Sequence, residues 1–367
     1  MKRRYKILGG LAAVLAVLLL ALGLVLSHEG ECRPAPVVAD GAATMRAVIH
    51  RCYGGTEVLE LVTVEKPVPA ADRVLVRVRA SAVNPYDWHF LTGSPYLMRL
   101  EIGIGAPADG RVGVDFAGTV EAVGSAVTTL APGDRVFGGA SGAFAEYVTV
   151  RQDGSIAKIP EGVGFEDAAT VGIAGITALQ ALRDHAGVEP GDRVLINGAS
   201  GGVGSFAVQM AKALGAEVTG VASARHLETL RALGADHVID YREQRYIDSD
   251  ERWDAVIDNV GNFSPRQVAG VLEDDGVLVL VGGPKGDWVA PFVRPVQAML
   301  WSPFTKPRLG MMLGDMRQAD FEIIGEMLAD GRVRAVIDER FPLAQAAAAI
   351  ERWQNGDGAG KVIVTVP

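Results

Sequence analysis

Cysteine is nearly absent from this chain of 367 residues, which contains only Cys32 and Cys52. No Cys-x-x-Cys pair occurs, so the sequence supports neither a disulfide framework nor a zinc cluster built from thiolates. We therefore interpret both cysteines as incidental. The hydrophobic share of 49% is enough for a sizeable buried core, and the length suits two ordinary domains.

Acidic residues outnumber basic ones beyond the first six residues. Lys2, Arg3, Arg4 and Lys6 contribute +4 to a formal net charge of −9, so the rest of the chain carries −13. A chain with this acidic balance is a poor match for the phosphate backbone of nucleic acids. We expect no nucleic-acid partner.

An uncharged apolar run of 20 residues, 7–26, follows the basic N-terminus and is long enough to cross a bilayer as a helix. A cleavable signal peptide has a shorter apolar region and a small-x-small site, which the following "VLSHEGEC" lacks. The sequence therefore predicts an uncleaved, single-pass membrane anchor over 1–26 and a tether over 27–44. The side of the membrane on which the protein lies stays open.

Two kinds of pattern follow Met45. Short β-branched runs such as "RVLVRVRASAVN" and "AFAEYVTV" predict a β-rich domain over 45–170. From residue 171 to 315, strands such as "RVLING" and "EVTGVA" alternate with helical runs, which predicts a doubly wound parallel sheet with helices on both faces. The last part of the chain, 316–367, is expected to return to the first domain and to complete it with residues 330–367.

A glycine-rich loop joins the first strand of this α/β region to a helix. It fits the Gly-x-Gly-x-x-Gly dinucleotide fingerprint with alanine in the first place. The bare backbone at Gly201 lets N–H groups approach a pyrophosphate, and Gly204 lets the helix lie close to the sheet. The loop residues expected to bind a dinucleotide are Ala199, Ser200, Gly201, Gly202, Val203 and Gly204.

The acidic residue that holds the adenosine ribose of NAD, about 20 residues after such a loop, is missing. "GVASARH" stands there, with Ser223 and Arg225 and no carboxylate before Glu228. A hydroxyl and a guanidinium bind a 2′-phosphate through charge-assisted hydrogen bonds, whereas a carboxylate repels it. We predict NADPH as the cofactor, with Tyr241 beside the adenine ribose. A solvated Arg225 at a helix start is the alternative.

The Tyr-x-x-x-Lys pair of short-chain dehydrogenases is also absent, because no tyrosine has lysine four residues later. From Met45 onward the chain resembles the medium-chain dehydrogenase/reductase superfamily and its zinc-free, quinone oxidoreductase-like branch. The motifs that carry the resemblance are "YGGTEVLEL", "VLVRVRASAVNPYDWHFLTG", "GVDFAGTVEAVG", "PGDRVFG", "GAFAEYVTV", "AATVGIAGITALQAL", "NGASGGVG" and "LGADHVIDY". The resemblance implies an α/β protein in which a Rossmann domain interrupts a GroES-like substrate domain.

Zinc-dependent members of that superfamily use a cysteine and a Gly-His-Glu motif as metal ligands. This chain has "AVNPYDWH" at the first position, and Asp87 with His89 does not complete a tetrahedral site, so we expect no metal. The resemblance implies that Asn84 and Tyr53 lie beside the nicotinamide and the substrate, with Asp87 as a further catalytic candidate. A turn at Asn84 and a helix cap at Asp87 are the alternatives.

The resemblance also implies contacts to the nicotinamide half of the cofactor. Thr177 is expected near the nicotinamide, the loop from Asn259 to Gly261 beside it, and Gly282 and Gly283 near the carboxamide. Lys361 is expected near a phosphate, with a solvated lysine as the alternative.

One segment, 287–313, mixes tryptophan and phenylalanine with basic residues and four prolines. We interpret it as a homodimer surface or an active-site cover, with contact to lipid headgroups as the alternative. The predicted function is a membrane-tethered, zinc-independent NADPH oxidoreductase that acts on a quinone, an enone or a related carbonyl compound. An NAD(P)-dependent alcohol dehydrogenase and a non-catalytic, NADPH-sensing partner of a membrane complex stay open as alternatives.

Overall fold

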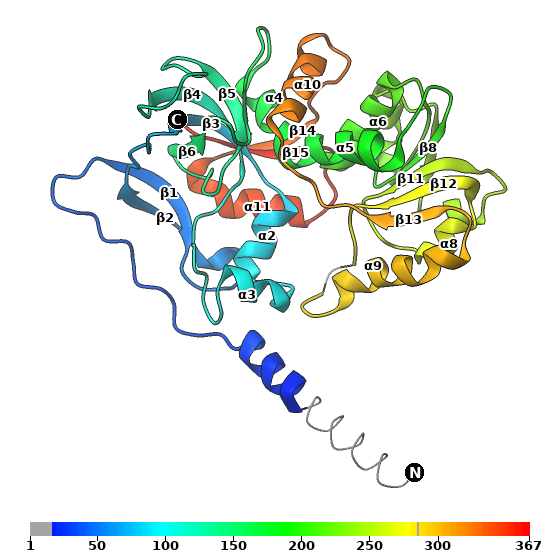
Figure 1. Cartoon of the computed structure of the whole chain (residues 1–367), viewed down its shortest axis with the longest axis horizontal. Helices are drawn as coiled ribbons and strands as arrows, with labels where there is room; N and C mark the ends of the chain where they lie inside the picture. The colour runs from blue at the N-terminus through cyan, green and yellow to red at the C-terminus, as the bar shows by residue number, and fades with distance from the viewer. Residues whose placement is uncertain (1–16, 285) are drawn as a thin grey trace.

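Two main sheets, one in each lobe, organise the part of the chain that the computed structural model describes, residues 17–284 and 286–367 (Figure 1). The first is a largely antiparallel sheet of seven strands. Its central strand alternates as the pattern predicts, because Val76 and Val78 are fully buried while Arg77 between them is exposed. The strands are β3 (Arg73–Ala82), β4 (Asp115–Val123), β5 (Arg135–Gly139), β6 (Tyr147–Arg151), β7 (Ile156–Lys158), β14 (Ile337–Pro342) and β15 (Lys361–Thr365).

The end of the chain completes this first lobe. Strand β15 pairs antiparallel with β3 and parallel with β14. A separate two-stranded ribbon, β1 (Thr44–His50) and β2 (Leu59–Glu65), belongs to the same lobe. The residue boundaries that the sequence suggests for the two domains stay predictions.

The second sheet is parallel throughout, in the order β10-β9-β8-β11-β12-β13. The chain starts at β8 and runs outward first through β9 and β10, then on the other side through β11, β12 and β13. A ligand crevice forms where the strand order reverses, here between β8 and β11. The strands are β8 (Arg193–Asn197), β9 (Glu217–Ala222), β10 (His237–Asp240), β11 (Trp253–Asp258), β12 (Leu272–Leu280) and β13 (Arg308–Met311).

Helices α5 and α6 cover one face of the parallel sheet, and α8 and α9 cover the other (Figure 1). The predicted fold, a GroES-like lobe joined to a Rossmann sheet, is therefore confirmed. The helices are α2 (Pro85–Thr92), α3 (Arg99–Ile102), α4 (Phe165–Ala169), α5 (Ile176–Gln180), α6 (Gly202–Ala213), α7 (Leu227–Ala232), α8 (Pro265–Ala269), α9 (Ala290–Trp301), α10 (Gln318–Ala329) and α11 (Ala346–Gln354).

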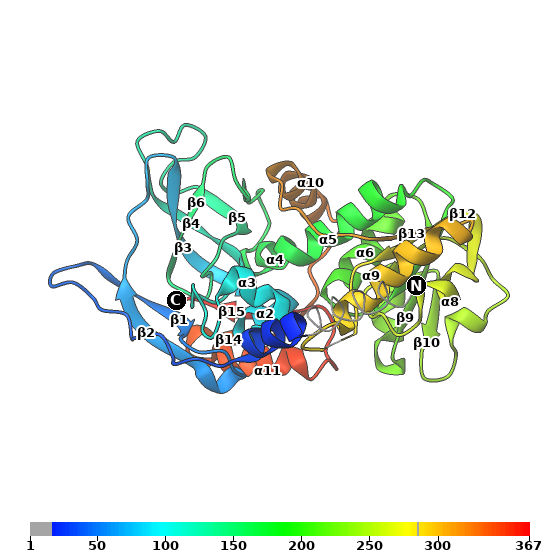
Figure 2. The same cartoon turned by 60° about the horizontal axis from the view of Figure 1, so that its bottom comes forward.

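The predicted membrane anchor and membrane-bound localisation are contradicted. Within residues 17–284 and 286–367, no helix is both long enough and apolar enough to span a bilayer. A helix over residues 17–27 comes to the front of the molecule near α11 in Figure 2, and a Cβ built on Gly23 would lie 3.5 Å from the ring of Trp288. Residues 1–16 of the predicted anchor lie outside the described residues.

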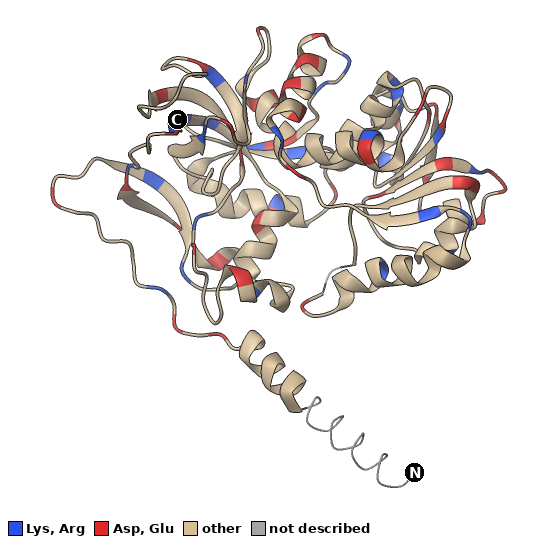
Figure 3. Cartoon of the chain, in the orientation of Figure 1, with Lys and Arg blue, Asp and Glu red and all other residues tan. Residues whose placement is uncertain are grey.

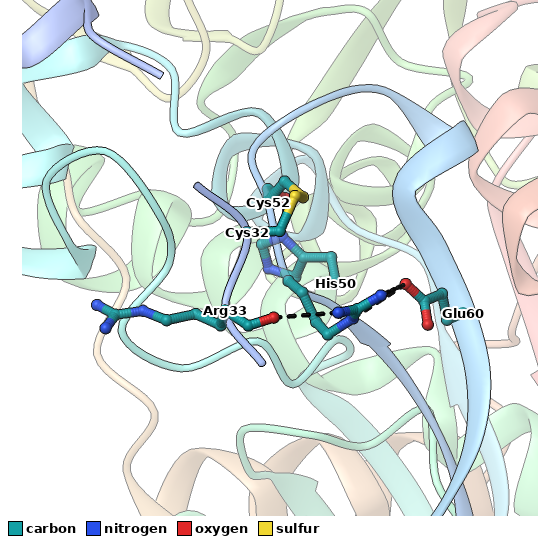
Figure 4. The surroundings of a disulfide bond; sticks show 6 residues. Cys32, Arg33, His50, Cys52 and Glu60 are labelled. Atoms are coloured by element: carbon teal, nitrogen blue, oxygen red, sulfur yellow. Dashed lines mark hydrogen bonds and ion pairs between the residues drawn. A yellow bond between two sulfur atoms is a disulfide. The ribbon is translucent and has the colours of Figure 1, made fainter. Parts of the chain in front are cut away.

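The interpretation of the two cysteines as incidental is wrong, because Cys32 and Cys52 form a disulfide (Figure 4). The bond joins the segment expected to be a tether to the end of β1. Nearby, Gly30 N donates to Gly105 O at 2.8 Å and Arg33 N donates to Arg51 O at 2.9 Å. The segment is thus fastened along the first lobe.

Acidic and basic side chains are interspersed over both lobes (Figure 3). Segment 287–313, which was interpreted as a dimer surface or cover, forms α9 and β13 at the edge of the parallel sheet. Its exposed apolar side chains include Phe292, Val296 and Phe304. The homodimer stays a prediction, and so does the alternative of contact with lipid headgroups.

Candidate active site

A cleft of about 770 Å³ runs between the lobes, past the carboxyl ends of β8, β9 and β11. The parallel sheet supplies one wall, which begins with Asn197 and Gly198 after β8. The first lobe supplies the other wall, from Val83 to Tyr86 at the start of α2 and from Gly356 to Lys361 before and into β15. This cleft lies where the strand order of the parallel sheet reverses.

The glycine-rich loop occupies the middle of the wall that the sheet supplies. Each of its glycines is explained by a different feature of the structure. Helix α6 starts at Gly202, so the N–H groups of its first turn have no carbonyl partner within the helix. A Cβ on Gly204 would stand 2.2 Å from Gly198 O, so only glycine permits this approach of helix to loop. A Cβ on Gly201 would meet no protein atom closer than 3.6 Å, so the space there is open to a ligand.

The loop is also joined to the opposite wall. Gly201 forms a β-bridge with Gly360, and Gly360 N donates to Ser200 O at 2.8 Å. A Cβ on Gly202 would lie 2.8 Å from Cδ of Lys361. The glycine-rich loop of one lobe therefore packs directly on the C-terminal strand of the other.

The residues present fit a dinucleotide. In addition to the open space at Gly201, Asn259 Oδ1 is buried at the cleft and has no hydrogen-bond partner among the described residues, while its Nδ2 donates to Asn197 O at 3.0 Å. At the cleft, this acceptor is available to a hydrogen-bond donor of a bound ligand. Thr177 lines the same end of the cleft.

A buried polar cluster backs the wall of the first lobe. Lys361 Nζ donates to Val83 O at 2.7 Å and to Asn84 Oδ1 at 2.5 Å, and it lies 3.6 Å from Asp115 Oδ2. Asn84 Nδ2 donates to Ala82 O and to Asp115 Oδ2 at 3.0 and 2.9 Å. Both ends of the Asn84 amide are therefore occupied by protein groups, which fixes its orientation at the cleft.

Asp87 belongs to this cluster as the helix cap that the sequence offered as an alternative. Asn84 N donates to Asp87 Oδ2 at 2.7 Å, which closes a capping box at the start of α2. Burial raises the pKa of Asp87 to about 7 and raises the pKa of Asp115, whereas it lowers the pKa of Lys361. Asp87 does not line the cofactor cleft.

Tyr53 lies away from the predicted position beside the substrate. It is 6% exposed, its hydroxyl donates to Gly103 O at 2.7 Å, and the guanidinium of Arg99 stacks 4.4 Å from its ring centre. Arg99 in turn donates to the carbonyl of Leu26 at 3.0 Å. Tyr53 thus helps to hold the N-terminal segment in place, and it does not line the cleft.

The end of the cleft beyond β9 is where the sequence predicts the adenosine. Ser223 and Tyr241 line the cleft there, while Arg225 turns its guanidinium toward Asp357 of the first lobe, with Nη1 3.3 Å from Oδ2. His226 and Arg352 also line this end.

The structure therefore brings most of the predicted residues to one cleft. Those that line it are Asn84, Thr177, Ser200, Gly201, Gly202, Val203, Gly204, Ser223, Tyr241, Asn259 and Lys361. Those that do not are Tyr53, Asp87, Ala199, Arg225, Gly282 and Gly283. Ala199 is buried behind the loop, and a Cβ on Gly282 would lie 2.1 Å from Asn259 O, so both shape the wall from behind. The ammonium of Lys361 turns to Asn84 and Val83, away from the expected phosphate.

Sequence reasoning missed Tyr86, whose "NPYD" context gave the only signal, and the residues of α11 and its following loop. Tyr86 lines the cleft, is 43% exposed and stacks on Phe90 with ring centres 4.0 Å apart. Arg352 and Trp353 reach the cleft from α11, a helix distant in sequence from the nucleotide loop. Among residues 17–284 and 286–367, no group of three or more histidine, cysteine, aspartate or glutamate side chains is placed to hold a metal ion.

Two family models match the chain. The alcohol dehydrogenase GroES-like domain matches residues 70–161, and the zinc-binding dehydrogenase family matches residues 233–364. The second match spans strands β10 to β13 of the parallel sheet and the return to the first lobe.

Individual relatives cover nearly the whole chain. A chloroplast envelope quinone oxidoreductase homolog of Arabidopsis thaliana is 33% identical over 338 residues, which are 87% of this chain and 98% of the relative. A trans-enoyl reductase of Aspergillus terreus is 33% identical over 328 residues, 80% and 86% of the two chains. The structure of the quinone oxidoreductase from Coxiella burnetii superposes with a TM-score of 0.79 at 31% identity and covers 88% of this chain and 100% of that one. The chain therefore belongs to the quinone oxidoreductase-like family of the medium-chain dehydrogenase/reductase superfamily, and it is an oxidoreductase that uses a nicotinamide cofactor.

Proposed function

We propose that this protein reduces a quinone, an enone or a related carbonyl compound with NADPH, and that it does so without a catalytic metal. The observation that carries the proposal is the composition of the cleft beyond the glycine-rich loop. Apolar side chains dominate the walls there, among them Val83, Ile173, Val281, Met312 and Leu313. Such walls suit a flat, uncharged acceptor ring or conjugated double bond.

The cofactor, when bound, supplies the hydride. The first-turn N–H groups of α6 and the open space at Gly201 are suited to its pyrophosphate, and Asn259 Oδ1 is free to accept a hydrogen bond from the nicotinamide half. Asn84 is held in one orientation by Lys361 and Asp115, so its side chain is a fixed surface against which the reactants are positioned.

Transfer of hydride to an enone or quinone leaves negative charge on a carbonyl oxygen, and the acceptor takes up one proton for each hydride. Tyr86 is the hydroxyl donor in our proposal, since it lines the cleft and reaches solvent. Burial raises the pKa of Tyr86, so its hydroxyl stays protonated and able to donate at neutral pH. A single donor of this kind is sufficient for an acceptor that is already activated by conjugation.

The test is a titration of the full chain with NADPH and NADH, followed by NADPH oxidation in the presence of quinones, enones and aldehydes, each with and without a chelator. Turnover that favours NADPH and persists with chelator supports the proposal. Faster oxidation of secondary alcohols by NADP⁺ than reduction of any quinone or enone would favour an alcohol dehydrogenase. Tight binding without turnover of any acceptor would favour a sensing role.

A further inference from the structure

The sequence has no carboxylate directly after β9. A carboxylate from the other lobe, that of Asp357, lies close to this position instead. Asp357 lies in the loop between α11 and β15, 132 residues after Arg225. Its Oδ2 lies 3.3 Å from Nη1 of Arg225, and its backbone carbonyl lies 3.0 Å from Nε2 of His226. The neighbouring glycines, Gly356 and Gly358, line the adenosine end of the cleft.

This position coincides with the place where Rossmann proteins choose between the two nicotinamide cofactors. The end of the second strand, here Ser223 after β9, faces the ribose 2′ position, where a carboxylate favours NADH and a guanidinium favours NADPH. Arg225 is the guanidinium that follows Ser223 in the sequence, and its Nη1 already pairs with Asp357. A 2′-phosphate that binds this nitrogen has to displace Asp357.

The neighbouring charges also determine how readily a phosphate can displace Asp357 from Arg225. Arg352 also pairs with Asp357, and it contacts Asp338 at 2.9 Å and Glu339 at 3.1 Å. Two guanidiniums thus face three carboxylates. Hydrogen bonds from Arg352, with a smaller contribution from Arg225, hold the pKa of Asp357 below its usual range, so the carboxylate is charged at neutral pH.

We infer that Asp357 is a cofactor-specificity residue that acts from the substrate lobe: by holding Arg225, it reduces the preference for NADPH over NADH. The inference rests on the proposed use of NADPH. It predicts that the wild-type protein prefers NADPH over NADH less strongly than the sequence "SAR" alone suggests. This preference should increase when the pairing of Arg225 with Asp357 is removed.

The experiment compares Kd values for NADPH and NADH in the full chain and in four variants: Asp357→Asn, Arg225→Ala, their combination, and Asp153→Asn. Asp153 is the matched control, because it is an exposed aspartate paired with Arg151 and it is far from the cleft lining. Since exposed ion pairs are weak, Asp357→Asn is expected to tighten NADPH binding about threefold and to leave NADH unchanged or slightly weaker. Asp153→Asn should change neither value.

The combined variant separates the inference from the cofactor proposal. In the Arg225→Ala background, Asp357→Asn should give a smaller gain for NADPH, because Arg225 is absent and only Arg352 is released from Asp357. An unchanged NADPH/NADH ratio in Asp357→Asn, or an equal gain in both backgrounds, would overturn the inference. If Arg225→Ala alone leaves NADPH binding intact, the proposed NADPH selectivity through Arg225 fails as well, which is a different result. Thermal unfolding of each variant verifies that the fold is retained.

Discussion

Lys361 Nζ lies 3.6 Å from Asp115 Oδ2 at the wall of the cleft, and the two side chains are only 5% and 0% exposed. Removing the ammonium leaves a carboxylate buried without its counter-charge. We expect Lys361→Met to lower the free energy of unfolding by about 3–5 kcal/mol, which is typical for breaking a buried ion pair from one side. Chemical denaturation measures this loss.

The control is Lys158→Met, which removes a lysine whose side chain is 59% exposed and which pairs with Asp134 at 2.9 Å. Its loss should stay below about 1 kcal/mol. Similar losses of unfolding free energy in the two variants would mean that the stability of the buried cluster at Asn84 does not depend on the charge of Lys361.

Asp87 should make stability depend on pH near neutrality. Its pKa is about 7 in the folded protein and 3.8 when exposed, so the folded state binds the extra proton between these values. Its contribution is fully present below pH 3.8, decreases as pH rises through 7, and is flat above. The slope approaches about 1.4 kcal/mol per pH unit.

Asp87→Asn removes this titration while an amide oxygen can still accept from Asn84 N. Free energies of unfolding for wild type and variant, measured from pH 3 to pH 9, should run parallel below pH 3.8, separate in favour of the variant between pH 3.8 and pH 7, and differ by a constant amount above pH 7. Parallel curves over the whole range would show that folding does not change the pKa of Asp87. The nearby Asp115 and Lys361 are common to both proteins, so the difference reports Asp87.

Two glycines of the nucleotide loop should respond differently to the same substitution. Gly204→Ala places a methyl group 2.2 Å from Gly198 O, so it should destabilise the protein by about 1–3 kcal/mol through overpacking. Gly201→Ala has open space within the protein, so it should fold normally and weaken NADPH and NADH alike. Denaturation together with cofactor titration distinguishes the two outcomes. A stability loss in Gly201→Ala would mean that the space is not open within the protein, and unchanged cofactor binding would mean that no ligand occupies it.

The local parts of this architecture were predictable from the sequence, and the long-range pairings were not. The strand, glycine loop and helix at 193–213 are adjacent in the chain, and their periodicity and glycine spacing suffice. Asp357, by contrast, reaches Arg225 only because β15 returns to the first lobe, and no local pattern encodes that distance. The same holds for Lys361, whose ammonium is drawn to buried Asp115.

The cysteines illustrate a second limit. Two cysteines without a motif carry no pairing signal, yet Cys32 and Cys52 meet because Gly30 and Arg33 hydrogen-bond along the first lobe. Tyr53 was expected at the cleft from the resemblance alone. Its ring is instead held by Arg99, whose backbone partners in the N-terminal segment were not apparent before folding.

The disulfide should stabilise the protein measurably. It closes a loop over a sequence separation of 20 residues, for which the loss of unfolded-state entropy corresponds to about 3 kcal/mol. Reductant should therefore lower the unfolding temperature of the wild-type protein. The double variant Cys32→Ser, Cys52→Ser should unfold at that lower temperature with or without reductant. If reductant changes nothing in the wild type and thiol labelling finds both cysteines free, the bond does not form in solution.

Tyr86 can be tested without disturbing the cofactor. Tyr86→Phe keeps the ring stacked on Phe90 and removes only the hydroxyl. We expect kcat with an enone or quinone to fall about tenfold or more, because a donor to the developing oxyanion is lost, while Kd for NADPH is unchanged. Steady-state kinetics with a cofactor titration gives both values, and an unchanged kcat would assign the proton to water.

The bridge between Gly201 and Gly360 has a mechanical consequence. Any rotation that separates the lobes while it keeps the hydrogen bond from Gly360 N to Ser200 O must have its axis close to the phosphate loop. Two hydrogen bonds also join the lobes at Asp287, one from Ser94 Oγ to Asp287 Oδ1 at 2.8 Å and one from Tyr96 N to Asp287 O at 2.7 Å. A rotation about the glycine-rich loop would have to break either of these two bonds that it displaces, so the loop and Asp287 are two separate points at which the lobes are tied.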